Sequence, residues 1–272
     1  MRIIVCLKQV IDPLTPASAL ALDQVEKKIR VSLTAPPVIN GFDEQGLEAA
    51  LRLREANKDI EIVCLAAGGH FNTDVMKRSL AVGADQLILV QDPSLDTWDP
   101  YPIASALAAA IRQIGGADLV ICGRQGSDWD NALTPYILAD LLALPLLTLA
   151  KRIGISDGKR VEIERVLADG TMVMKADLPA LVTVTSELGA LRMPNVAARL
   201  AAARKRPRQI ALAELTDVAA PTHAPEVVDL AIPVNGRSCT FIEAADGSSL
   251  GSRLAETLLQ AGVIRLGGER QP

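Results

Sequence analysis

Residues 118–130 read DLVICGRQGSDWD, and this stretch decides the fold. Its first part, Asp118–Cys122, is a short and mainly aliphatic run of the length of a strand that is buried on both faces. The polar segment Gly123–Asp130 follows directly, and a helical pattern begins at Asn131. A buried strand, a glycine-containing turn and a helix in this order are typical of a parallel α/β sheet.

The same alternation extends from this stretch toward the amino terminus. Three further aliphatic runs have the length of buried strands, at 2–7 (RIIVCL), 61–66 (EIVCLA) and 86–90 (QLILV). Amphipathic or alanine-rich patterns predict helices over 43–56, 72–82, 102–114 and 131–144. Strand and helix in steady alternation predict right-handed crossovers. We therefore expect a doubly wound parallel sheet with helices on both faces.

The pattern changes after Pro145. Four successive strands joined by short turns are expected over 146–155, 161–167, 171–175 and 180–185. Because short turns join antiparallel strands, the sheet is expected to gain antiparallel strands at its edge.

Beyond Glu187 the strand and helix rhythm weakens. We expect three parts: an α/β domain over 1–187, a loop and linker arm over 188–232, and a tail over 233–272 with a last helix at 250–261. The arm holds the basic run Arg204–Arg208, which we interpret as solvated surface. The last helix has an apolar face, so it must dock on the core or on another chain.

The composition excludes several classes of protein. A net charge of −4 and 3% aromatic residues argue against nucleic acid as the main partner. The four cysteines form no CxxC pair, which argues against a zinc site or a redox dithiol. We see neither a signal peptide nor an apolar stretch that could span a membrane. The expectation is a reduced, soluble protein of the cytoplasm or of an organelle matrix.

Ligands of doubly wound sheets bind where the carboxyl ends of the strands meet. Four segments reach that edge: 8–9, 67–70, the loop from 91, and 123–130. The last is the richest, since its two glycines allow close approach of a ligand and the next helix offers free N–H groups to a phosphate. It is neither a Walker loop nor a dinucleotide fingerprint. An ordinary polar loop remains the alternative.

Few side chains suggest catalysis. For Asp128 and Asp130 we prefer capping of the next helix, or contact with ribose hydroxyls, over a metal site. We interpret His70 as a polar loop residue and His223 as a solvated linker residue. Cys6, Cys64 and Cys122 lie in aliphatic runs, which predicts small buried side chains rather than reactive thiols.

Several blocks then carry a family resemblance. They are Lys8–Asp12 (KQVID), Asn40–Asp43 (NGFD), the helix from Gly46 to Leu53, Ala81–Asp85 (AVGAD), Gly123–Asp130, Leu178–Thr183 (LPALVT) and Met193–Asn195 (MPN). Together the blocks resemble the beta (small) subunit of electron transfer flavoprotein, including the FixA type, over nearly the whole chain.

The resemblance implies an adenine-nucleotide-binding fold and a heterodimer with a larger alpha subunit. Alpha holds most of the FAD, and beta binds AMP in ordinary members of the family. The positions that match the cofactor-binding residues of the family are Cys6, Asn40, Gly41, Phe42, Asp43, Cys64, Ala67, Gly123, Arg124, Gln125, Gly126, Ser127, Asp128, Trp129, Asp130, Asn131, Ala132, Leu133 and Thr134.

The resemblance also implies partners. The FAD of such proteins shuttles electrons from dehydrogenases, such as the acyl-CoA dehydrogenases of fatty acid oxidation, to a quinone reductase or another acceptor. Residues 188–195 correspond to the loop that recognises the dehydrogenase, which directs attention to Leu191, Met193, Pro194 and Asn195. Met193 takes the place of the anchoring leucine of the family. The last helix would pack on the alpha subunit.

Three alternatives stay open at this point. Electron-bifurcating members of the family hold a second FAD in place of AMP, and Arg124 resembles them whereas Asn131 and Leu133 do not. We favour AMP. A nucleotide-using hydrolase or ligase would need a catalytic set that we do not find. A stand-alone AMP-binding module resembling universal stress proteins would lack the extra strands and the long carboxyl-terminal arm.

Overall fold

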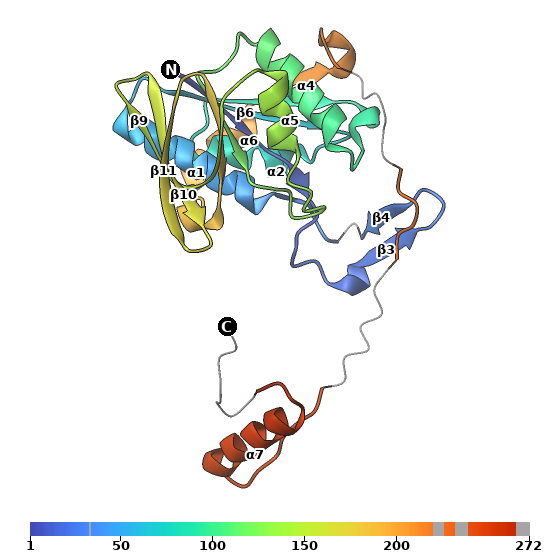
Figure 1. Cartoon of the computed structure of the whole chain (residues 1–272). Helices are drawn as coiled ribbons and strands as arrows, with labels where there is room; N and C mark the ends of the chain where they lie inside the picture. Colours follow the sequence, from blue (N-terminus) through green and yellow to red (C-terminus); the bar gives the residue numbers. More distant parts are fainter. Residues whose placement is uncertain (33, 220–225, 232–238, 265–272) are drawn as a thin grey trace. The chain divides into compact units, whose positions relative to one another are not determined.

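The aliphatic runs of the sequence form the centre of one large sheet. A computed structural model describes residues 1–32, 34–219, 226–231 and 239–264 (Figure 1). The sheet contains nine strands. In spatial order they are β11 (Gly170–Asp177), β10 (Arg160–Leu167), β9 (Leu146–Ser156), β12 (Ala180–Val184), β8 (Leu119–Gly123), β1 (Arg2–Cys6), β6 (Glu61–Gly68), β7 (Gln86–Gln91) and β13 (Arg208–Ala211).

All neighbours from β9 to β13 in this order run parallel, and only β10 and β11 are antiparallel to their neighbours. The chain starts at the central strand β1, proceeds outward through β6 and β7, and then crosses to β8 on the other side of β1. The order of strands therefore reverses between β1 and β8. The predicted doubly wound parallel sheet with antiparallel edge strands is confirmed.

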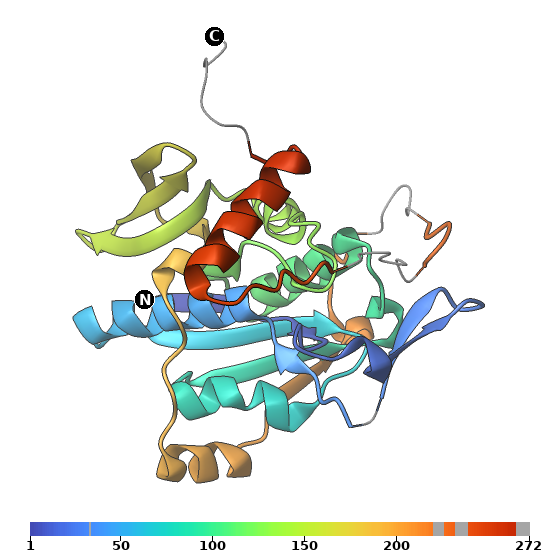
Figure 2. The ribbon, with the colours of Figure 1, turned by 90° about the horizontal axis from the view of Figure 1, so that it is seen from below.

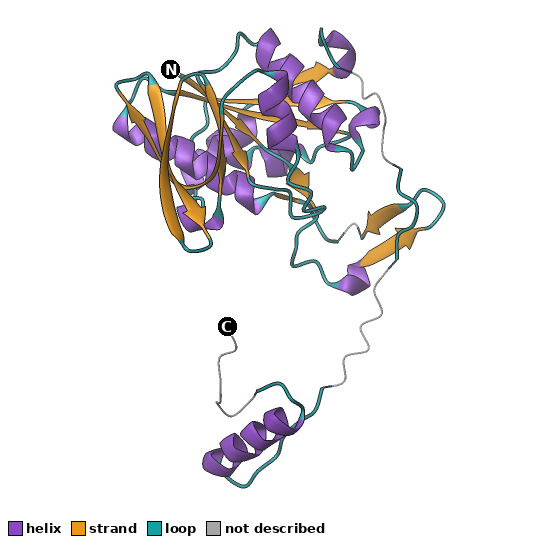
Figure 3. Ribbon diagram, in the orientation of Figure 1, coloured by secondary structure: helices purple, strands orange, loops and turns teal. Residues whose placement is uncertain are grey.

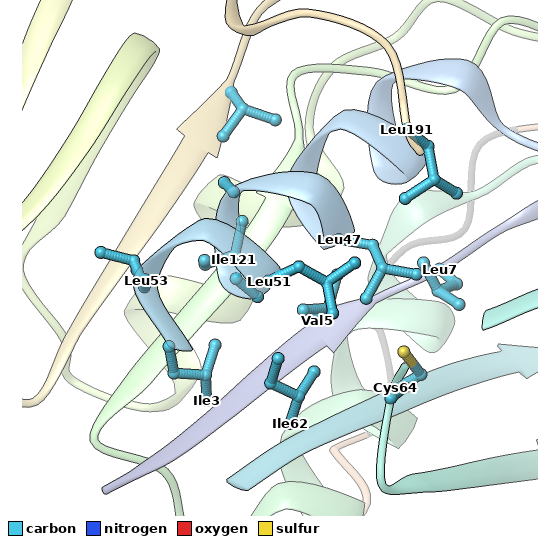
Figure 4. Close-up of a cluster of buried hydrophobic side chains, with 14 of the residues drawn as sticks. Ile3, Val5, Leu7, Leu47, Leu51, Leu53, Ile62, Cys64, Ile121 and Leu191 are labelled. Atoms are coloured by element: carbon cyan, nitrogen blue, oxygen red, sulfur yellow. The ribbon is translucent and has the colours of Figure 1, made fainter. Parts of the chain in front are cut away.

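Helices cover both faces of the sheet (Figures 1 and 2). One face packs against α1 (Gly41–Ala56), α2 (Thr73–Met76), α3 (Arg78–Val82) and α6 (Val196–Arg204), and the other against α4 (Pro100–Gln113) and α5 (Thr134–Leu141). Each face buries its own aliphatic cluster. Figure 4 shows Leu47 and Leu51 of α1 directed at Val5 of β1 and Ile121 of β8.

Two predicted helices differ from the observed ones. The helix expected over 72–82 is divided into α2 and α3 around Lys77, and the hydroxyl of Ser79 donates to the carbonyl of Met76 (2.8 Å). A serine that bonds back to the preceding turn competes with helical backbone bonds. The helix expected over 131–144 covers only 134–141, because Asp130 and Ala132 have positive φ, which a helix does not accommodate.

Three strand arrangements differ from what the sequence indicated. β12 does not pair with β11; it lies parallel between β8 and β9. The basic run leads into the unexpected strand β13, which pairs with β7. Two small sheets stand apart from the main one, β2 (Gln9–Val10) with β5 (Val38–Ile39) and β3 (Leu20–Asp23) with β4 (Lys28–Val31), as Figure 3 shows for β3 and β4.

By internal contacts the chain separates into two units, Met1–Leu230 and Ala231–Pro272. Residues 188–219, for which the sequence predicted a loop and linker arm, thus lie in the first unit. The second unit contains α7 (Gly247–Gln260), whose amino end carries a reciprocal bond between Asp246 and Ser249. Four short 3-10 helices complete the described elements, at Ala17–Ala19, Pro93–Leu95, Ser186–Leu188 and Leu212–Glu214. Within the described residues, no helix is long and apolar enough to cross a membrane.

Candidate functional site: a ligand cradle at the switch point

The loop after β8 is shaped by two side chains from the start of α1. Both Asn40 and Asp43 are buried, and both bond to main-chain groups of the chain around them. We call residues 123–131, together with Lys8, Asn40 and Asp43, the cradle. Because β1 and β8 flank the point where the strand order reverses, the cradle lies where doubly wound sheets bind ligands.

Asp43 joins the ends of two strands. Its carboxylate accepts from the amide of Lys8 after β1 (2.7 Å) and from the amide of Gly123 at the end of β8 (3.1 Å). Burial disfavours the charged form and raises the pKa of Asp43 to about 7. The side chain of Asn40, the two main-chain bonds and the charge of Lys8 act in the opposite direction. The role of this buried carboxyl group is therefore structural. Its two oxygen atoms accept from main-chain amides and so hold the ends of β1 and β8 in place.

Asn40 holds the same loop further along. Its side-chain amide donates to the carbonyl of Gln125 (2.8 Å), and its side-chain oxygen accepts from the amide of Ser127 (3.2 Å). Its own main-chain amide donates to the carbonyl of Lys8 (2.8 Å). The amide group of Asn40 thus satisfies one donor and one acceptor of the loop. The conformation of residues 123–127 is set before any ligand binds.

Glycine is required at position 123. A Cβ there would lie 2.8 Å from the main-chain carbon of Phe42 and would overlap the carboxylate of Asp43. A substitution would therefore push the amino end of α1 away from β8. Close approach of two backbones explains this glycine without any need for an unusual φ.

Charged side chains line the outer part of the cradle. Lys8 forms an ion pair with Asp128 (2.6 Å), and Gln125 donates to Asp130 (2.7 Å). Neither aspartate caps the next helix, since α5 begins after Leu133 with no side-chain cap. The capping role predicted for these aspartates is therefore wrong, because the left-handed residues 130 and 132 carry the chain away from a capping geometry.

Two buried polar atoms of the cradle have no partner. They are the Nε of Arg124 and the hydroxyl oxygen of Ser127. The guanidinium of Arg124 lies over the ring of Phe42, 4.8 Å from its centroid, which fixes a positive charge at this edge. Unsatisfied buried polar groups are costly, so a bound anionic or hydroxyl-bearing ligand is a plain explanation for them. These groups suit the phosphate and ribose of a nucleotide.

Trp98 is a residue that the sequence reasoning missed. It lies in the loop after β7, and its ring centroid is 6.3 Å from that of Trp129 in the cradle. The side chain of Asn131 donates to the carbonyl of Trp98 (3.5 Å). Trp98 has no periodic pattern around it, but its place after a predicted strand could have signalled it.

Three further positions that the resemblance assigned to the cofactor, Cys6, Cys64 and Ala67, lie on strands outside the cradle. Cys6, Cys64, Cys122 and Ala67 are all buried on strands, as the hydrophobic interpretation of the three cysteines predicted. Burial raises the pKa of the Cys64 thiol to about 12, and the Cys6 sulfur together with burial raises the pKa of Cys122 above its usual range. These positions can contact a ligand only through the main chain or at the strand ends.

The loop 188–195 is held against α1 by charges. The guanidinium of Arg192 donates to Glu48 (2.9 and 3.0 Å), and Arg52 bonds both Glu48 (3.0 Å) and the carbonyl of Leu188 (2.9 Å). The two arginines lower the pKa of Glu48 although its burial acts in the opposite direction. We call Glu48, Arg52 and Arg192 the staple.

The four residues predicted for partner recognition are not equivalent. Leu191 is only 7% exposed and contributes to the core beneath the loop, where Figure 4 shows it beside Leu47. Asn195 caps α6 by accepting from the amide of Ala198 (2.8 Å). Met193 is 79% exposed, and Pro194 beside it is half-buried. Met193 is thus the apolar side chain that the loop presents to solvent.

Other candidates are outside the cradle or outside the described residues. His70 is exposed, and His223 lies outside the described residues. No group of three or more histidine, cysteine or acidic side chains that could hold a metal occurs in the part of the chain that the structure describes.

The fold and the cradle define a class: doubly wound α/β proteins that hold a ligand between the first strand and the strand across the switch point. The comparisons with known proteins narrow this class. The family model described as "Electron transfer flavoprotein domain" matches residues 31–215. The chain belongs to the electron transfer flavoprotein family.

Individual relatives agree. An "Electron transfer flavoprotein subunit beta" of Megasphaera elsdenii is 32% identical over 211 residues, which cover 75% of this chain and 76% of the relative. A "Caffeyl-CoA reductase-Etf complex subunit CarD" of Acetobacterium woodii is 32% identical over 72% of each chain. A "Protein FixA" of Azorhizobium caulinodans is 33% identical, over 75% of this chain and 73% of the relative.

Proposed function

We propose that this chain is the beta subunit of a heterodimeric electron transfer flavoprotein and serves as an electron carrier. The single observation that carries the proposal is family membership over two thirds of the chain, with relatives named as beta subunits. In this proposal the chain contributes no catalytic acid, base or nucleophile to the redox reaction. It binds and orients nucleotides, while FAD, shared with and mostly held by an alpha subunit, supplies the redox chemistry.

For the chain's own nucleotide we propose AMP. The main chain of residues 123–127, held in place by Asn40 and Asp43, would receive the phosphate. The hydroxyl of Ser127 and the Nε of Arg124 are buried without partners and would bond to phosphate or ribose. The positive charge of Arg124 would offset the negative charge of the phosphate.

The proposed partners follow from the same family membership. An alpha subunit would bind the chain, with the apolar face of α7 as one contact, since none of its residues is buried. A dehydrogenase, such as an acyl-CoA dehydrogenase, would dock on Met193, and a quinone reductase or another acceptor would receive the electrons. We further propose that the complex works in the cytoplasm.

Release of the bound nucleotide tests the cofactor. The chain would be purified together with any subunit that accompanies it, denatured, and the released ligand separated by chromatography and quantified. We expect one AMP and one FAD for each pair of subunits. Two FAD and no AMP would replace this assignment by the electron-bifurcating form. Absence of any nucleotide would contradict the proposed function.

Co-purification tests the heterodimer. A tagged copy of the chain, expressed with its genomic neighbours, is expected to retain a larger flavin-containing subunit in equimolar amount. A stable monomer that contains no nucleotide would contradict the heterodimer. Reduction of the complex by a dehydrogenase, followed by the flavin absorbance, then tests the carrier role directly.

A further inference from the structure

The aromatic residues of this chain are gathered at one edge of the sheet. The chain has only seven: three Phe, two Trp and two Tyr. Among the described residues, no buried hydrophobic position of the core is aromatic. Apart from Phe241 in the second unit, they lie in two kinds of place. Phe71, Trp98 and Trp129 lie in loops after parallel strands, and Phe42, Tyr101 and Tyr136 lie in the first turn of a helix.

Burial in the core accounts for only part of this distribution: Phe71 packs partly buried against the core, whereas Trp129 and Tyr136 are exposed. Large aromatic side chains stabilise a protein most when they are buried, because each carries a large apolar area. Here the core is filled by aliphatic side chains, and Trp129 keeps 41% of its surface exposed. Exposed aromatic residues that cluster at a ligand-binding edge are typical of surfaces that stack on a planar ring.

The two tryptophans form the centre of this group. Their ring centroids are 6.3 Å apart and their planes are inclined by 44°, so they form a tilted aromatic pair. Trp129 is part of the cradle loop, and Trp98 comes from the neighbouring loop 92–99. The pair therefore joins two of the loops that surround the proposed nucleotide.

The loop that carries Trp98 is held firmly from three sides. Gly69, after β6, approaches it so closely that a Cβ there would lie 2.6 Å from the Cβ of Asp96. Lys28, from the β3–β4 hairpin, forms an ion pair with Asp96 (2.7 Å). Asp99 caps α4 through the amide of Tyr101 (3.0 Å). These contacts restrain the main chain on both sides of Trp98.

The residue after Trp98, Asp99, has a hydrogen-bond acceptor without a partner. Asp99 is 6% exposed, and its Oδ2 is buried without a hydrogen-bond partner. A ligand that brings an N–H or hydroxyl donor beside its ring would satisfy this oxygen. An adenine amino group and a ribose hydroxyl are such donors.

From this juxtaposition we infer that Trp98 and Trp129 form the stacking surface for the planar ring of the bound nucleotide, and that Trp98 is a specificity-determining residue. The inference rests on the proposed function and deepens it. The ring is a heteroaromatic base, either the adenine of AMP or a ring of FAD, while the cradle holds the phosphate and ribose. Ribose 5-phosphate, which lacks a heteroaromatic ring, would use the cradle alone.

The test measures binding of AMP, FAD and ribose 5-phosphate by calorimetry. It uses the full chain with any subunit that co-purifies, after the bound nucleotide has been removed. Trp98→Leu and Trp129→Leu remove an aromatic face, and Trp98→Phe and Trp129→Phe retain one. Phe241→Leu is the matched control, because it removes the one aromatic side chain outside the edge. Near-ultraviolet circular dichroism and unfolding curves establish that each variant is folded.

We expect each Leu variant to weaken binding of the physiological nucleotide about tenfold, in the range of base–aromatic stacking. Binding of ribose 5-phosphate and the Phe241→Leu control should not change, and the Phe variants should restore most of the affinity. If AMP is the ligand that loses affinity, the stacked ring is its adenine. If FAD loses affinity, the stacked ring belongs to FAD.

Two results overturn the inference and leave the proposed function intact. The first is unchanged nucleotide binding in both Leu variants. The second is an equal loss of affinity for ribose 5-phosphate, which would mean that the substitutions had moved the loops. If the unmodified chain binds neither AMP nor FAD, the proposed function itself fails. The failures of the two proposals are therefore distinguishable.

Discussion

Helix α1 holds two loops by different physical means. At its amino end, Asn40 and Asp43 hold the cradle loop through buried hydrogen bonds to the main chain. In its middle, Glu48 holds the loop 188–195 through ion pairs with arginines that are partly exposed. Buried dipolar bonds are little affected by salt, whereas exposed ion pairs are screened by it. The first device suits a loop that must keep one shape for a small ligand. The second suits a loop that adjusts to a protein partner.

The largest expected effect concerns the charge of Asp43. Its pKa is raised from 3.8 to about 7 in the folded chain, so the folded state binds more protons than the unfolded state between these values. The stabilising contribution of this group is therefore complete below about pH 4 and is lost as the pH rises to about 7. At about 1.4 kcal/mol per pKa unit, the total is on the order of 4 kcal/mol.

Urea unfolding between pH 4 and 8 checks this expectation. Asp43→Asn keeps the shape of the side chain but does not titrate, so the difference between the two proteins isolates Asp43 from all other groups. The free energy of unfolding of the unmodified protein, relative to that of Asp43→Asn, should fall as the pH rises through this window and level off near pH 8. A constant difference would mean that Asp43 ionises like an exposed aspartate.

Asn40→Ala should be next in size. The substitution leaves the carbonyl of Gln125 and the amide of Ser127 without their partner, and each unsatisfied group costs about 1–3 kcal/mol. We expect a loss of about 2–4 kcal/mol in the free energy of unfolding, with little dependence on salt, and weaker nucleotide binding. Asn57→Ala, at the exposed end of α1, is the control. Strong salt dependence of the Asn40→Ala effect would contradict the distinction between the two loops.

Arg192→Ala should have a smaller and salt-dependent effect. It leaves Glu48, only 5% exposed, with Arg52 alone, and we expect a loss of about 1–2 kcal/mol that shrinks as salt is raised from 0.1 M to about 1 M. Proteolytic cleavage within 188–195 should become faster in the same variant. Arg160→Ala, which removes the well-exposed pair with Asp177, should cost no more than about 0.5 kcal/mol. An Arg192 effect equal to that of Arg160 would mean that the staple does not hold the loop.

The smallest effect on stability is expected for Met193→Ala. With 79% of its surface exposed, the side chain should contribute less than about 0.5 kcal/mol to the free energy of unfolding. Electron transfer from the native dehydrogenase should nevertheless lose about 1–2 kcal/mol in kcat/KM, the range of a buried apolar anchor. Leu14→Ala, also an exposed apolar side chain, is the matched control. An unchanged rate would show that Met193 does not anchor the partner.

The sequence predicted the parts of the fold that depend on local pattern. The four runs of aliphatic residues became β1, β6, β7 and β8, because a strand buried on both faces needs apolar side chains at nearly every position. The sequence also predicted that the segment after β8 lies at the carboxyl edge of the central strands, where doubly wound sheets bind ligands, and the structure places it there. That it binds a ligand stays a prediction.

What the sequence could not predict depends on residues far apart in the chain. Lys8 pairs with Asp128 across 120 positions, so the role of this aspartate was not visible in its neighbours. Strand β13 forms because β7 offers it an open edge, and its basic flank concealed this pairing. Trp98 lacks any periodic pattern, and only the fold brings it beside Trp129.

The two edge strands of the large sheet bear on the tendency of the protein to aggregate with other chains. An exposed edge strand offers unpaired main-chain groups to any other chain. One edge, β13, is only four residues long and begins at Arg208, the last residue of the basic run. The other edge, β11, carries Lys175 and Asp177, which pair with Glu162 and Arg160 of β10. Brevity on one side and charge on the other are features that disfavour pairing of the nine-stranded sheet with a strand of a neighbouring molecule.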